Sequence, residues 1–176
     1  MIYYQDQDIL IRNMQASDAP IITEEEIAQG WHQTVEKYEM RLRDQAEGKC
    51  ISLVAEYQGQ VAGYINVYWD WAITAGAFAG KGYPEIVDFG VLEKFRRRGI
   101  GSKLMDAAEQ IAREKSDTVC LGVGLYESYG SAQRLYVKRG YIPDGSGIWY
   151  ADKPCEPYGT YDVDDSLVLF FSKKLD

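Results

Sequence analysis

Residues 87–101 read VDFGVLEKFRRRGIG and form the most informative stretch of the chain. The apolar run at its start predicts a strand, and apolar residues recur at helical spacing after Ile100. Gly99 and Gly101 lack side chains, so backbone amides of the turn can approach a ligand closely. Because the N-terminus of the following helix carries partial positive charge, the turn predicts a site for a phosphate-bearing ligand.

The charge around this turn is opposite to that of the whole chain, whose 176 residues carry a formal net charge of −8. The acidic balance disfavours nucleic acid, which requires a basic face, and attracts cationic partners. The turn is not a nucleotide P-loop, since the order Gly-x4-Gly-Lys-Ser/Thr is absent. It is not a dinucleotide fingerprint either, because Arg96 replaces the first glycine. An anion is expected beside the basic residues Lys94, Arg96, Arg97, Arg98 and Lys103.

The composition predicts one domain over residues 1–176, long enough to bury a core without crosslinks. The cysteines, Cys50, Cys120 and Cys155, form no CxxC or Cys/His cluster, so neither a disulfide framework nor a metal site is expected. No run approaches the ~20 apolar residues of a membrane span. We therefore expect a cytoplasmic protein with no membrane or nucleic-acid partner, and a homodimer stays open.

The pattern of strands and helices predicts an α/β domain of the α+β type, with a single mixed, mainly antiparallel sheet flanked by helices. Gln58-Gly59-Gln60 predicts a hairpin between two strands. Ser17 or Asp18 is expected to cap the first helix, and Thr23 with Glu26 suggests a capping box. Residues 72–84 have no period and predict either a mobile lid or a plain surface loop. The expected strands cover 9–14, 50–57, 61–71, 119–123 and 167–172, together with the apolar strand that leads into the glycine turn and an extended segment from Tyr141. The expected helices lie within 18–47, after Ile100, and over 131–139, where Gly140 suits a left-handed C-terminal cap.

Two motifs resemble those of one enzyme family. The spacing Arg96-x-x-Gly99-x-Gly101 resembles the acyl-CoA signature, Arg or Gln-x-x-Gly-x-Gly or Ala, of the GCN5-related N-acetyltransferases (GNAT). AQRLY at 132–136 with KRGY at 138–141 resembles the family pattern Asn-x-x-Ala-x-x-Leu-Tyr-x-x-x-Gly-Phe. The order of elements also matches over nearly the whole chain. Two residues depart from the pattern: Tyr129 replaces the usual asparagine, and Glu93 replaces a usual proline.

The resemblance implies the GNAT fold, acetyl-CoA as co-substrate, no metal, and direct acetyl transfer to a primary amine without a nucleophilic residue. In the family, amides of the glycine turn bind the pyrophosphate, and a strand amide stabilises the oxyanion. The asparagine's role is not transferred to Tyr129, although its hydroxyl can donate one hydrogen bond. The implied cofactor-binding residues are Phe89, Gly90, Val91, Arg96, Arg97, Arg98, Gly99, Ile100, Gly101, Ser102, Tyr129 and Tyr136.

The candidate catalytic residues are Tyr136, Glu85 and Asp88. Tyr136 matches the family tyrosine that protonates the departing thiolate, although an apolar helix face also suits plain packing. Glu85 stands six residues before Val91, as in the Glu-x5-Val strand of the histone-acetylating branch. A rise of about 3.3 Å per residue places it roughly 20 Å from the pyrophosphate end, the reach of a pantetheine arm. Strand alternation puts Asp88 on the opposite face, and a bulge would exchange the two, so Asp88 or a water chain is the rival base.

Aromatic and acidic residues gather where the acceptor is expected. This mixture suits a cationic amine of a small molecule or peptide, although each residue alone could be an exposed loop residue. A non-catalytic acyl-CoA-binding or regulatory module of the same fold is the alternative function, and a nucleotide-binding domain is a third. The residues concerned are Trp69, Asp70, Trp71, Tyr83 and Glu85, with the segment 144–165.

Overall fold

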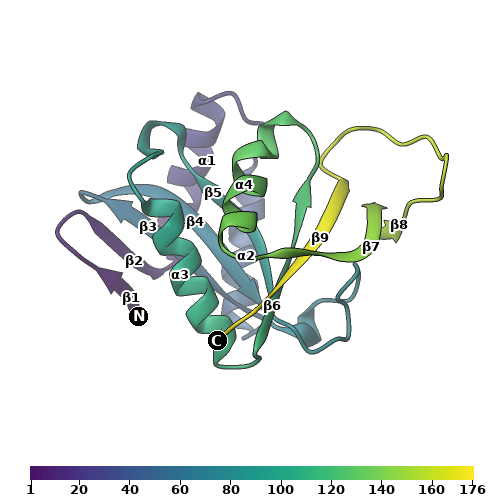
Figure 1. The fold of residues 1–176 in the computed structure, drawn as a ribbon. Coiled ribbons are helices and arrows are strands. Elements are labelled where there is room, and N and C mark those ends of the chain that lie inside the picture. The colour runs from purple at the N-terminus through teal and green to yellow at the C-terminus, as the bar shows by residue number, and fades with distance from the viewer. The chain divides into compact units, whose positions relative to one another are not determined.

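A computed structural model describes residues 1–176 (Figure 1). Its hydrogen-bonded strands follow the order β1-β2-β3-β4-β5-β6-β9-β7-β8 in one nine-stranded sheet. The predicted fold class, a mixed and mainly antiparallel sheet with helices, is confirmed. Two compact units divide the chain: Met1–Tyr68 with Val87–Ile111, and Trp69–Ile86 with Ala112–Asp176. Strand β5 (Glu85–Val91) gives its first two residues to the second unit and the rest to the first.

The first unit contains an antiparallel ladder of β1 (Ile2–Gln5), β2 (Ile9–Asn13), β3 (Cys50–Tyr57) and β4 (Gln60–Tyr68). The predicted β3–β4 hairpin is confirmed. Gln58 and Gly59 both have positive φ, 49° and 79°, which matches the twist of a two-residue hairpin turn. Strand β4 ends at Tyr68, earlier than predicted, because the next residues enter the 3-10 turn η1 (Asp70–Ala72).

Helices cover both faces of this ladder. On one face, α1 (Asp18–Ala28) and α2 (Val35–Ala46) enclose a core in which Ile22, Tyr38 and Tyr64 are buried. On the other face, α3 (Ile100–Arg113) buries its apolar stripe, and Leu104 lies so close to Gly63 that a methyl group there would sit 3.3 Å from it. The amphipathic pattern of 100–113 is therefore explained by packing on the sheet.

The predicted cap of α1 is wrong. Ser17 makes no side-chain cap bond, and Thr23 lies inside the helix, where its hydroxyl donates to the carbonyl of Ala19 at 2.8 Å. Asp18 instead accepts a hydrogen bond from the Gln15 amide at 2.7 Å and pairs with Arg12. Arg12 and the Gln15 amide thus occupy the carboxylate of Asp18, which does not cap the first amides of α1.

The second unit is built around β6 (Thr118–Gly124), which pairs in parallel with Glu85 and Ile86 and antiparallel with β9 (Leu167–Lys174). Strand β7 (Ile142–Tyr150) pairs with β9 and with β8 (Lys153–Pro154). The 3-10 turn η3 (Glu127–Tyr129) leads into α4 (Gly130–Lys138). Gly140 follows α4 with φ 89°, the left-handed conformation predicted for that position.

Phe78 anchors the segment 72–84, which carries no further strand or helix. Its ring is buried with Cys120 and Phe170, and Tyr83 and Trp149 pack against this cluster. The segment is thus tied to the core of the second unit through Phe78 and Tyr83. No helix in the chain has the length and apolar character to cross a membrane.

Candidate active site

The glycine turn joins β5 to α3 through the 3-10 turn η2 (Glu93–Phe95). Gly99 has φ 80°, and apart from the adjoining residues no atom lies within 4 Å of the place where its Cβ would be, so the space above the turn is open. At Gly101 a Cβ would meet the Phe89 ring at 3.2 Å and Val91 at 3.5 Å. The first amides of α3 have no partner within the helix, so this turn can cradle a phosphate.

The basic residues around the turn are engaged in different ways. Lys94 is paired with Glu25 at 2.6 Å, whereas Arg98 lies over the ring of Tyr57 at 4.9 Å and Lys103 over the ring of Tyr4 at 4.4 Å. A cation on an aromatic ring keeps its full charge, because the ring carries none. Arg98 and Lys103 can therefore attract the phosphates of a cofactor.

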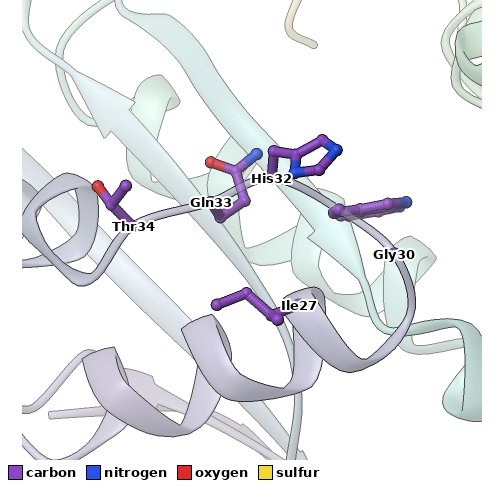
Figure 2. A pocket seen from close by; sticks show the side chains of 6 residues that line it. Ile27, Gly30, His32, Gln33 and Thr34 are labelled. Atoms are coloured by element: carbon purple, nitrogen blue, oxygen red, sulfur yellow. The ribbon is translucent and has the colours of Figure 1, made fainter.

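A pocket adjoins the turn at the connection between α1 and α2 (Figure 2). The guanidinium of Arg96 lies 5.8 Å from the ring of Trp31, and the Glu93 amide donates to the Gln29 side chain at 3.0 Å. The end of α1 is thereby tied to the cofactor turn, a link that no sequence motif indicated. The pocket is lined by Ile27, Gly30, Trp31, His32, Gln33 and Thr34.

Asp88 lies on the α2 side of β5, opposite the face on which Phe89 and Val91 approach Gly101. Its carboxylate accepts hydrogen bonds from Arg41, including one from Nε at 3.1 Å, and lies 3.6 Å from the amine of Lys37. The backbone φ of Asp88 is 49°. Arg41 and Lys37 thus both hold the carboxylate of Asp88. The positive φ changes the direction of the strand at this residue.

Glu85, in the second unit, stands beside Cys120 in the parallel β5–β6 ladder. Burial, with a smaller contribution from the negative charge of Asp152, raises the pKa of Glu85 to about 7. The pKa of the Cys120 thiol is also raised, chiefly by burial and then by Glu85. The carboxylate can therefore exchange a proton near neutral pH, while the thiol stays protonated and is a poor nucleophile.

Tyr136 lies on α4 with 6% of its surface exposed, and its ring centroid is 5.8 Å from that of Tyr141. Burial raises the pKa of Tyr136 above its ordinary value, so the phenol keeps its proton at neutral pH. A buried phenol suits both packing and proton donation.

Tyr129 donates a hydrogen bond to Asp165 at 2.8 Å, and Tyr126 donates to the same oxygen at 2.5 Å. A Cβ at Gly124 would lie 2.4 Å from the Tyr129 ring, so the ring fits only because residue 124 is glycine. The hydroxyl that replaces the family asparagine is thus directed to a carboxylate.

In each unit, residues that contact or influence the candidate groups belong to no sequence motif. Arg41 reaches Asp88 from α2, and Asn66 donates from β4 to the carbonyls of Val87 and Asp88. Asp152 comes from the β7–β8 turn, where it has φ 63°. The sequence feature that could have indicated Asp152 is Ala151-Asp152 itself, a two-residue link between short extended runs, which is typical of a hairpin turn.

The acetyltransferase (GNAT) family model matches residues 13–141. The chain therefore belongs to the acetyltransferase (GNAT) family, and it is an N-acetyltransferase that uses acetyl-CoA, as the two motifs implied. The open space at Gly99 and the available charges of Arg98 and Lys103 fit this cofactor. No group of three or more His, Cys, Asp or Glu side chains is arranged to hold a metal ion.

One relative in sequence supports this assignment, and two solved structures share the fold. An N-alpha-acetyltransferase of Sulfurisphaera tokodaii is 32% identical over 115 residues, which are 57% of this chain and 67% of that protein. The acetyl transferase of Salmonella typhimurium that modifies the N-terminal serine of the 50S ribosomal subunit protein L7/L12 has a TM-score of 0.71 at 12% identity, with 100% of both chains covered. A putative acetyltransferase from Salmonella typhimurium, solved with its cofactor acetyl-CoA, has a TM-score of 0.65 at 21% identity, covering 97% of this chain and 95% of that one.

Proposed function

We propose that this protein acetylates a primary amine of a cationic substrate, and that the amine is the free N-terminus of a peptide or protein. The carrying observation is Glu85, whose pKa is raised to about 7 beside an aromatic cluster. A peptide α-amine has a pKa of about 7.7–8.0, whereas a lysine amine has about 10.4. A base with a pKa near 7 can accept a proton at neutral pH, and an α-amine gives up its proton more readily than a lysine amine does.

Two relatives favour the peptide over the small molecule as acceptor. One is named for N-alpha acetylation, and another is described as modifying an N-terminal serine. The acidic net charge of −8 also attracts substrates that carry positive charge. A small cationic amine remains the second acceptor class, and the test below separates the two.

We assign the steps to residues as follows. Glu85 accepts a proton from the substrate ammonium, and the neutral amine can then attack the acetyl carbonyl carbon. Acetyl-CoA supplies the acetyl group as a thioester. An amide of Phe89, Gly90 or Val91 donates a hydrogen bond to the oxyanion. Tyr136 gives its proton to the departing sulfur, so CoA leaves as the thiol. The proton that the attached nitrogen loses as the amide forms returns to the Tyr136 phenolate through water, and Glu85 releases its proton to solvent, so charge and protons balance.

The experiment is a turnover screen that detects the thiol released from acetyl-CoA. The panel contains peptides with a free α-amine, the same peptides blocked at the N-terminus but carrying lysine, and a set of polyamines. We expect the highest kcat/KM for free α-amines, with mass spectrometry locating the acetyl group at the first residue. Equal or higher turnover of lysine peptides or polyamines would refute the α-amine assignment. Acetyl-CoA binding without turnover of any amine would favour the non-catalytic module.

A further inference from the structure

The backbone of β5 bends at Asp88, which has φ 49° within a strand. This left-handed conformation is unfavourable for a residue with a Cβ and persists only where the surroundings hold it. Asparagine and aspartate tolerate it better than other such residues. The contacts around Asp88 should therefore explain why the strand keeps this path.

Asn66 holds the main chain on both sides of the bend. Its side chain is 1% exposed, and its Nδ2 donates to the carbonyl oxygen of Val87 at 3.0 Å and to that of Asp88 at 3.2 Å. Turning the amide over would place Oδ1 against two carbonyl oxygens, so its orientation is defined. The Oδ1 of Asn66 is buried and has no hydrogen-bond partner. The Nδ2 of Asn66 thus donates to two successive carbonyl groups of β5.

Arg41 holds the side chain of Asp88 from α2. The guanidinium donates from two nitrogens to one carboxylate oxygen, and it is fixed in turn by the hydroxyl of Tyr68, which accepts from it at 2.6 Å. Tyr68 donates to Asp44 at 2.5 Å and offers its ring to the guanidinium at 5.0 Å. Lys37 adds a second cation at 3.6 Å. The acid is therefore one member of an ordered network.

Beyond the bend, β5 lies very close to β4 at Gly63 and Gly90, so a change of path at Asp88 would be transmitted to these contacts. A Cβ at Gly90 would be 2.9 Å from the ring of Tyr64, and a Cβ at Gly63 would be 2.7 Å from the carbonyl oxygen of Gly90. Such approaches are possible only between glycines and their neighbours. Any relaxation of the bend must therefore move the residues that follow it.

We propose that Asn66 and Asp88 are positioning residues, which fix the path of β5 and so present Phe89, Gly90 and Val91 to acetyl-CoA. Asp88 acts through its ion pair with Arg41 and not as the base. The inference rests on the proposed function, in which these three residues bind the cofactor and stabilise the oxyanion. It gives the two candidate carboxylates different roles: Glu85 is the base, and Asp88 positions the strand.

Two substitutions of Asp88 separate positioning from base catalysis. Asp88→Ala loses the ion pair and the tolerance for positive φ, and a displacement of about 1 Å can lower kcat about 10²-fold. Asp88→Asn removes the base but keeps an oxygen for Arg41 and the tolerance for φ 49°. We expect Asp88→Asn to keep most of the activity that Asp88→Ala loses. Glu85→Gln, an equally conservative change at the proposed base, should lose activity. Equal losses in both Asp88 variants would overturn the assignment.

Asn66→Ala tests the main-chain contacts without depending on turnover. In the protein free of acetyl-CoA, amide hydrogen exchange over residues 87–91 should accelerate, while the β2–β3 ladder around Val54 keeps its protection. With a peptide acceptor, kcat should fall, and the acetyl-CoA Kd measured by calorimetry should rise by a smaller factor, because the glycine turn still binds the pyrophosphate. Unchanged exchange and unchanged kcat would refute the positioning role. If the wild type turns over no amine, yet Asn66→Ala accelerates exchange over residues 87–91, only the proposed function would be refuted.

Discussion

Replacing Glu85 by glutamine should stabilise the protein above neutral pH. The pKa of Glu85 is raised from 4.5 to about 7, so between these values the folded state binds more protons than the unfolded state. The free energy of unfolding of the wild type must then fall as pH rises through this window. Each pKa unit corresponds to about 1.36 kcal/mol, so the penalty is about 1 kcal/mol at pH 5 and about 3 kcal/mol at pH 8.

Glutamine carries no charge and avoids this penalty. Urea unfolding of the cofactor-free protein should therefore give a stability advantage for Glu85→Gln that grows from pH 5 to pH 8. At pH 8 the melting temperature should rise by roughly 6–12 °C for a domain of this size. Asp152→Asn is the matched control, and it should give a smaller gain, since burial is the larger cause of the shift. Stability curves of wild type and Glu85→Gln that stay parallel across this range would show that the pKa of Glu85 is not raised in the folded protein.

Three further outcomes test the cofactor site. Acetyl-CoA at a hundred times its Kd should stabilise the wild type by about 2.7 kcal/mol, and Gly101→Glu should abolish the melting shift; an equal shift in both proteins would contradict the site. Tyr136→Phe keeps the ring but should lower kcat by roughly 10² to 10⁴ with little change in acetyl-CoA affinity; unchanged kcat would leave Tyr136 a packing residue. Arg98→Ala should weaken acetyl-CoA binding roughly tenfold by calorimetry, and less at high salt; an unchanged Kd would exclude Arg98 from the phosphate contacts.

The predicted parts of the structure are those that depend on local sequence. The strand, turn and helix over 87–113 follow from periodicity and from glycine, and so does the left-handed residue Gly140 after α4. The β3–β4 hairpin follows from Gln58 and Gly59. Each of these features is decided by residues close together in the chain, which a single sequence displays.

The contacts that define the candidate site are not local. Asn66 and Arg41 meet β5 only after the sheet and α2 have assembled, and neither residue type at its position indicates this role. The pKa of Glu85 depends on burial and on Asp152, which follows much later in the chain. Alternation along β5 can place Asp88 on a face, but it cannot show that the acid is paired with Arg41.

Whether Glu85 is the base is tested by the pH profile of kcat/KM for wild type and Glu85→Gln with a free α-amine peptide. For the wild type we expect kcat/KM to rise with pH and level off above about 7–8, as Glu85 and the amine lose their protons. Glu85→Gln should be about 10²-fold slower at pH 7 and should recover part of that loss by pH 9, where the amine is already neutral. Profiles of equal height and shape would contradict the assignment of Glu85 as the base.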